Sequence, residues 1–222
     1  DTVSGLAFNA AGDRLASVAY DGTIHVWSIE TGAEISSLPQ QTVRFTCVAL
    51  SPDGLQLAVG GYDGLVHIWR DLADPMSVAA TTENTGTIRC LAYAPDGRQL
   101  AAGDDSGMLR LLNPGDASVL RTAKLDSEGV RSLAFAPDGS TLLIGSDLGR
   151  VQARSATTLE DAWGGQVLIP THAAPLLRIS FTDDGRLIAT ADQSGMVRIW
   201  NAATREWTSE FENHQDEIAA VG

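Results

Sequence analysis

The chain has 222 residues, a formal net charge of −13 and a hydrophobic fraction of 44%. This length and apolar content predict a folded core rather than a disordered tail, and the acidic balance argues against a general nucleic-acid binder. No stretch approaches 18 uninterrupted apolar residues, so no membrane-spanning helix is predicted. The two cysteines, Cys47 and Cys90, are too few for a disulfide framework, and we expect a reducing, cytoplasmic location.

Short strands with intervening glycine turns are predicted from the first residues onward. Alternating apolar runs cover residues 3–8, 14–20 and 23–29, and a shorter run at 34–38 follows a looser linker. Apolar residues at helical spacing are absent, so the pattern predicts an all-β chain.

The same arrangement of runs and turns then repeats along the chain. Phe8, Leu50, Tyr93, Phe135 and Phe181 occupy equivalent positions, spaced 42, 43, 42 and 46 residues apart. Four short strands in each such period are typical of a β-propeller blade. The predicted blades are residues 1–40, 41–84, 85–127, 128–173 and 174–215, and residues 216–222 would begin a sixth.

Three of the repeats end in a tryptophan motif: DGTIHVWS at 21–28, DGLVHIWR at 63–70 and SGMVRIWN at 194–201. With this motif the chain resembles the WD-repeat (WD40) β-propeller family, and its repeats resemble bacterial members. The resemblance covers nearly the whole chain and implies four-stranded antiparallel blades. It also implies a seven-bladed ring, with this chain as part of a larger protein and the other blades supplied by the same or another chain.

The resemblance also implies a structural role for the residues of the blade motif. In the family a His, a Ser or Thr, an Asp and the Trp form a buried network; the motif residues here are Asp21, Trp27, Asp63, Trp69, His172, Trp200 and His214. Leu112 and Arg154 stand where two tryptophans are expected, and Ser194 replaces the aspartate of the fifth blade. We therefore expect no blade to contain the complete network.

Motifs of catalysis, nucleotide binding and metal binding are not found in the sequence. His25 and His67 occupy equivalent repeat positions, which favours a structural role over acid–base chemistry. The Asp-Gly turns lack the spacing of a calcium loop and are predicted to be β-turns. We expect a protein that is not an enzyme and that holds no cofactor or metal.

The resemblance implies that partners dock on the face around the central channel. Three repeat positions are expected to converge there, and the residues we assign to partner binding are Arg44, Arg89, Arg131, Tyr20, Tyr62, Ser4 and Thr46. Arginine and tyrosine are enriched at binding hot spots, and arginine binds carboxylates in a bidentate manner. This pattern predicts a non-catalytic scaffold or sensor that binds an acidic peptide or loop of a protein partner.

Two other functions and one structural alternative stay open at this stage. A hydrolase or lyase could use the channel mouth of a propeller, and the arginine cluster could bind nucleic acid despite the net charge. Alternatively, the arginines could neutralise nearby acids such as Asp105 and Asp147.

Overall fold

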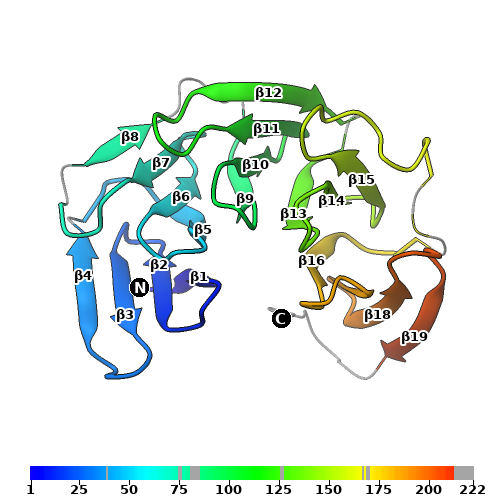
Figure 1. Cartoon of the computed structure of the whole chain (residues 1–222), viewed down its shortest axis with the longest axis horizontal. Helices are drawn as coiled ribbons and strands as arrows, with labels where there is room; N and C mark the ends of the chain where they lie inside the picture. Colours follow the sequence, from blue (N-terminus) through cyan, green and yellow to red (C-terminus); the bar gives the residue numbers. More distant parts are fainter. Residues whose placement is uncertain are drawn as a thin grey trace.

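The computed structural model describes residues 1–38, 40–74, 77–80, 86–125, 128–166, 168 and 171–212. These residues form five antiparallel sheets arranged as the blades of a propeller around a common centre (Figure 1). The predicted all-β propeller is therefore confirmed. The segment 216–222, predicted to begin a sixth blade, lies outside the described residues. In the described part of the chain, no helix is long and apolar enough to cross a membrane.

Four of the five sheets have four strands in simple sequential order. Blade one contains β1 (Val3–Phe8), β2 (Arg14–Ala19), β3 (Ile24–Ser28) and β4 (Glu34–Leu38); blade two contains β5 (Phe45–Leu50), β6 (Leu57–Gly61), β7 (Val66–Trp69) and β8 (Val78–Ala80). Blade three contains β9 (Ile88–Tyr93), β10 (Leu100–Asp104), β11 (Met108–Leu112) and β12 (Val119–Lys124); blade five contains β16 (Leu176–Phe181), β17 (Leu187–Asp192), β18 (Met196–Asn201) and β19 (Trp207–Glu212).

Blade four departs from the predicted four strands. Its sheet has β13 (Val130–Phe135), β14 (Thr141–Ser146) and β15 (Val151–Ser155). Beyond β15 the chain pairs with it only locally: the Ala162 amide donates to the Ala153 carbonyl (3.0 Å) and the Leu168 amide to the Val151 carbonyl (3.3 Å). Among the described residues of this longer repeat, the outer edge of the blade is thus contacted without a regular outer strand.

The turns between the first two strands are built as the sequence predicts. In the second blade the Asp53 carboxylate accepts hydrogen bonds from the Leu55 amide (3.0 Å) and the Ser51 hydroxyl (2.5 Å). Gly54 follows with a φ of 70°, a backbone conformation that glycine adopts without strain. The carboxylate is therefore engaged by its own turn, which is the β-turn interpretation rather than a cation loop.

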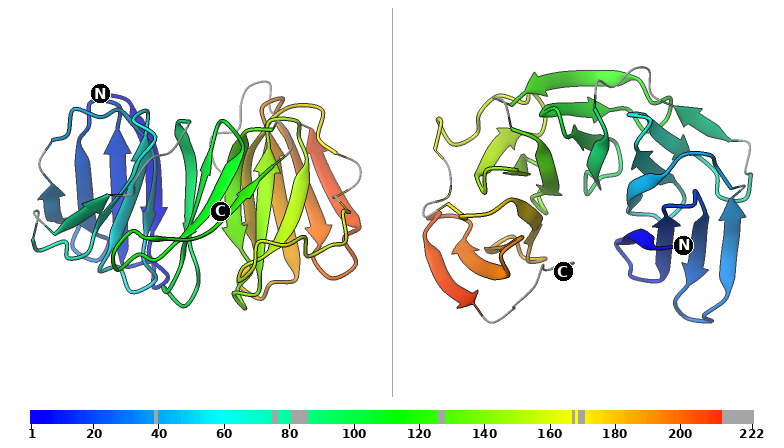
Figure 2. Two further views of the ribbon diagram at one scale, coloured as in Figure 1. Left: turned by 90° about the horizontal axis from the view of Figure 1, so that it is seen from above. Right: turned by 180° about the vertical axis from the view of Figure 1, so that it is seen from behind.

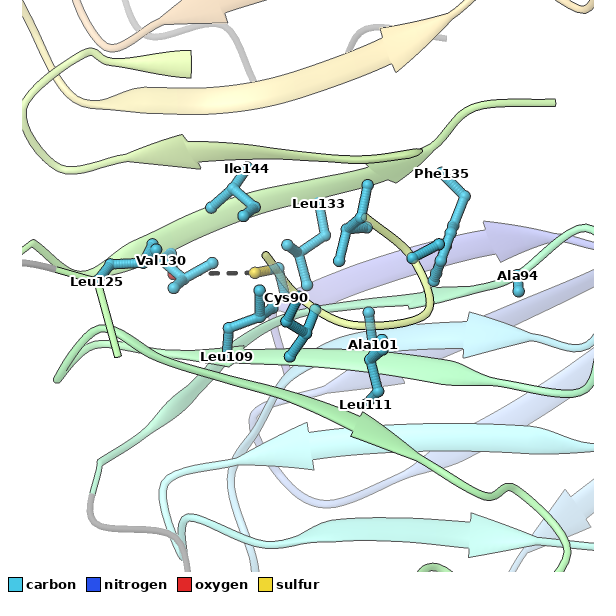
Figure 3. Close-up of a cluster of buried hydrophobic side chains, with 13 residues drawn as sticks. Cys90, Ala94, Ala101, Leu109, Leu111, Leu125, Val130, Leu133, Phe135 and Ile144 are labelled. Atoms are coloured by element: carbon cyan, nitrogen blue, oxygen red, sulfur yellow. Dashed lines mark hydrogen bonds between the residues drawn. The ribbon is translucent and has the colours of Figure 1, made fainter. Parts of the chain in front are cut away.

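Apolar side chains fill the seams between blades. At the seam of blades three and four, Cys90, Leu109 and Val130 belong to one buried cluster, and the Cys90 thiol approaches the Val130 carbonyl at 3.8 Å (Figure 3). Similar clusters join blades one and two, two and three, and four and five. Each blade is thus held by apolar contacts with its neighbours, as expected for a repeat unit that cannot bury its faces alone.

The arc of described blades is open between blade one and blade five (Figures 1 and 2). On β1, Leu6 and Phe8 are 63% and 59% exposed. Their register equivalents in blade two, Val48 and Leu50, are 8% and 5% exposed because blade one covers them. The exposed face of blade one therefore has the same apolar design as an internal seam.

The opposite end of the arc exposes the complementary kind of face. Val197 and Ile199 of β18 are half-buried, whereas their equivalents in blade one, Ile24 and Val26, are fully buried. Phe211, paired with Val197, is 52% exposed. Soluble monomers seldom leave two such faces open, since covering each large side chain is worth about 1.5–3 kcal/mol.

Replacing Phe8 with glutamate is expected to reduce self-association of the chain. The open apolar faces of different molecules should associate at high concentration. A carboxylate on the blade-one face opposes this association, because the contact would bury its charge. Light scattering over a concentration series measures the effect. Leu148→Glu is the matched control, because Leu148 is equally exposed (58%) but lies in a turn. Equal self-association of both variants and the parent chain would contradict the expectation.

Candidate partner-binding site at the channel mouth

Each first strand carries an irregularity at its start that presents one residue to the channel mouth. The register shifts between Val3 and Gly5 in β1, between Phe45 and Cys47 in β5, and at corresponding points in the other blades. The skipped residues are Ser4, Thr46, Arg89, Arg131 and Leu177, the same repeat position that the sequence assigned to partner binding. A bulge redirects a side chain away from the strand's alternation, which explains why this position differs from its neighbours.

Arg44 lies at the centre of an aromatic cluster formed by blades one and two. Its guanidinium carbon is 5.0 Å from the ring centroid of Tyr20 and 5.5 Å from that of Tyr62. The guanidinium carbon of Arg89 is 5.8 Å from the same Tyr62 ring. Cation–π contacts of this kind orient a guanidinium without neutralising its charge. Arg44 is exposed, and among the described residues it has no acidic partner.

The other two predicted arginines are paired with acids of the neighbouring turns. The Arg89 guanidinium is 3.3 Å from the Asp105 carboxylate, and Arg131 forms an ion pair with Asp147. These are the neutralising contacts that the sequence left open as an alternative. The structure thus separates the three arginines, since two have a carboxylate partner and Arg44 does not.

The hydroxyls of Ser4 and Thr46 form hydrogen bonds with backbone carbonyls. The Ser4 hydroxyl donates to the Phe45 carbonyl of the next blade at 2.7 Å. The Thr46 hydroxyl likewise donates to the Ile88 carbonyl of blade three and to the Gly60 carbonyl at 3.1 Å. These bonds join successive first strands, so both hydroxyls are satisfied without a partner protein.

The five first strands line an open cavity of about 190 Å³. Arg89, Arg131 and Arg178 all line it. The sequence analysis missed Arg178, because its repeat equivalents are Gly5, Cys47, Cys90 and Ser132. No regularity in the repeats therefore marked that position as basic.

Blade five contains the buried polar network that the sequence analysis expected to be incomplete. The His172 imidazole bonds through Nδ1 to the Asp192 carboxylate (2.8 Å) and through Nε2 to the Thr190 hydroxyl (2.7 Å). The Trp200 indole donates to the same hydroxyl at 2.9 Å. The expectation was wrong because the carboxylate comes from Asp192 at the end of β17, two residues before Ser194. Ser194 instead donates to Asp192, at 2.6 Å.

With His172 neutral, the hydrogen bonds of this network have the following order. The indole N–H donates to Thr190, the threonine O–H donates to Nε2 of a neutral His172, and Nδ1–H donates to Asp192. Burial lowers the pKa of His172 and thereby favours this neutral form, although hydrogen bonding to Asp192 acts in the opposite direction.

The remaining motif residues are also held within their own blades. Trp27 donates to the Ser17 hydroxyl (3.1 Å), and Asp21 accepts from the Thr23 hydroxyl (2.7 Å). In blade two Trp69 is buried, and Asp63 is 2.8 Å from His67. The other repeat histidine, His25, bonds to Glu34 at 2.6 Å. His214, assigned to the blade motif, lies outside the described residues.

The two thiols are buried and free. Desolvation raises the pKa of Cys47 to about 12 and that of Cys90 well above its usual value, so neither is a thiolate at neutral pH. In the described part of the chain, no group of three or more His, Cys, Asp or Glu side chains is placed to hold a metal ion.

The family comparison agrees with this geometry. The WD40 family, described as "WD domain, G-beta repeat", matches residues 1–28, 32–70, 77–113, 118–152 and 166–201, together well over half of the chain. The chain belongs to the WD40 family. Every matched segment ends within the third strand of a blade or directly after it, and those that start at residues 32, 77 and 118 begin just before a fourth strand. The sequence repeat and the blade are therefore offset along the chain. No curated protein matches the chain. WD40 repeats generally mediate protein–protein interaction or scaffolding.

Thr190→Val is expected to destabilise this WD40 domain. The methyl group keeps the shape of the side chain but leaves the Trp200 N–H and the His172 Nε2 without their partner, at a cost of about 1–3 kcal/mol each before relaxation. Urea unfolding measures the change. Thr204→Val, in an exposed turn, is the control and should change stability by less than about 0.5 kcal/mol. Equal effects of the two changes would contradict the role of the network.

The stability that His172 contributes is expected to decline as the pH falls below about 6.5, its ordinary pKa. The folded-state pKa is lowered, so the unfolded chain takes up a proton that the folded network resists, and acid favours unfolding. One such group changes the unfolding free energy by at most about 1.4 kcal/mol per pH unit. The stability difference between the parent chain and His172→Asn should therefore shrink from pH 7.5 to pH 5.5. A difference that is constant or grows would refute it.

Proposed function

We propose that this WD40 domain is a non-catalytic scaffold or sensor that binds an acidic peptide or loop of a protein partner at the channel mouth. The observation that carries the proposal is Arg44, an exposed guanidinium held between Tyr20 and Tyr62 without a carboxylate partner among the described residues. The two aromatic contacts orient the Arg44 side chain before binding. Little conformational entropy is therefore lost when it binds a partner's carboxylate.

The surrounding residues fit the same role. Tyr62 is 51% exposed and contacts both Arg44 and Arg89, so it offers an aromatic surface beside two cations. Arg89 and Arg131 use part of their donors for Asp105 and Asp147, and each guanidinium has five N–H groups. These two arginines would therefore support an acidic ligand at the edges, with Arg44 as its main anchor.

We further infer that additional WD-repeat blades cover the two open ends of the arc. The face that exposes Leu6 and Phe8 and the face that exposes Phe211 have the pattern of internal seams. A ring of about seven blades would cover both faces and surround the channel. The extra blades would come from the same chain in a larger protein or from another chain. The buried free thiols are compatible with the cytoplasmic location that we propose for it.

Selecting a random peptide library against the 222-residue chain tests the proposal. We expect the bound peptides to be enriched in aspartate and glutamate, and Arg44→Ala to weaken their binding roughly tenfold or more. Arg186→Ala is the matched control, because Arg186 is highly exposed on a turn of blade five and pairs with Asp184. Peptides without acidic enrichment, or equal binding by both variants, would overturn the proposal. An oligonucleotide that displaces the peptides with a steep salt dependence would indicate nucleic-acid binding instead.

A further inference from the structure

The cavity inside the channel has an unusual charge for so acidic a protein. Every ionised side chain that lines it is an arginine, and these three arginines come from the consecutive blades three, four and five: Arg89 of β9, Arg131 of β13 and Arg178 of β16. No aspartate or glutamate is among the described residues that line it. A cavity lined by cations in a chain of net charge −13 would attract an anion wherever the arginines are not fully neutralised.

The three guanidiniums keep unused hydrogen-bond donors. Asp105 is bonded to one terminal nitrogen of Arg89, and the Arg89 Nε is buried with no partner. Asp147 is bonded to the Nε of Arg131. The Arg178 guanidinium donates to the backbone carbonyl of the preceding residue, Leu177, at 2.7 Å. It has no carboxylate partner among the described residues. Two aspartates therefore balance three arginines, and Arg178 carries the uncompensated charge.

The other polar groups of the cavity neither neutralise these cations nor compete for them. The Ser4 and Thr46 hydroxyls donate to carbonyls in the seams, and the Ser132 hydroxyl accepts from the Ile179 amide at 3.0 Å. The Cys47 and Cys90 thiols are protonated and approach carbonyl oxygens at 3.8–3.9 Å. The cavity thus presents cationic donors against a wall that carries no negative charge.

We propose that this cavity binds a phosphate group, with Arg178 as its anchor and Arg89 and Arg131 completing the site. A tetrahedral oxyanion offers several oxygens to guanidiniums from three consecutive blades, and guanidinium–phosphate contacts are charge-assisted and often bidentate. The cavity of about 190 Å³ has room for such a group and is smaller than pockets for drug-sized ligands, which are about 300–1,000 Å³. The phosphate could be free or carried by a phosphorylated partner segment.

This site and the proposed peptide site have different anchors, Arg178 and Arg44, although Arg89 and Arg131 lie beside both. Arg44, Tyr20 and Tyr62 do not line the cavity, and the phosphate proposal holds whether or not an acidic peptide binds at the mouth. Arg44→Ala should therefore leave phosphate binding unchanged. A failure of the peptide selection would overturn the mouth proposal alone, and a failure of phosphate binding would overturn the cavity proposal alone.

A titration of the 222-residue chain with inorganic phosphate tests the site. Calorimetry and the phosphate-dependent rise in Tm report the binding. We expect saturable binding that Arg178→Leu weakens about tenfold or more. Arg186→Leu, which removes the same charge from an exposed turn of the same blade, should bind as the parent chain does. Sodium chloride at matched ionic strength separates a specific site from general screening.

Three results would overturn the proposal: no saturable phosphate binding by the parent chain, equal losses in Arg178→Leu and Arg186→Leu, or full replacement of phosphate by chloride. Arg178→Lys guards against a folding defect in the leucine variant, and we expect it to bind more weakly than the parent because it loses the bidentate fork. A phosphoserine peptide and its serine form then distinguish the sources. Tighter binding of the phosphopeptide than of inorganic phosphate assigns the site to a partner's phosphate, and the reverse order assigns it to free phosphate.

Discussion

Contact between successive blades is the constraint on which the rest of this structure depends. A four-stranded blade has two apolar faces and no interior of its own, so each face must be covered by a neighbour. The seam clusters meet this need with mainly apolar side chains. The Ser4 and Thr46 hydroxyls add a bond from the first strand of blade one to that of blade two, and from blade two to blade three. Where the arc ends, the same apolar pattern continues without a neighbour, and the exposed Leu6 and Phe8 mark the place.

The same packing that buries the faces also creates the site. First strands held side by side place one bulged residue from every blade at the channel mouth, so side chains about 40 residues apart in sequence become neighbours. Arg44 meets Tyr62 within blade two, and it meets Tyr20 because blade one packs against blade two. The framework is rigid and repetitive, and the chemistry lies in the positions where the repeats differ. This arrangement agrees with the general role of WD40 repeats in protein–protein interaction or scaffolding.

The degenerate repeats show how far local sequence can vary while the blade persists. Blade three has Leu112 in place of the motif tryptophan, and that leucine is fully buried in a seam. Blade five achieves the complete polar network with an aspartate at an unexpected position, because a carboxylate at the end of β17 can still reach the His172 imidazole. Apolar volume and hydrogen-bond satisfaction are therefore the requirements, and several sequences meet them.

The sequence by itself determined the strand order, the glycine turns, the blade period and the family, since each depends on local spacing and on residues that repeat. It also named Arg44, Arg89 and Arg131, because each occupies one of the three repeat positions expected to converge at the channel mouth. Only the tertiary structure decided which of these arginines is neutralised, that Asp192 rather than residue 194 completes the network, and that Arg178 enters the channel. These outcomes depend on distances between blades and on the direction of single side chains, which spacing along the chain does not encode.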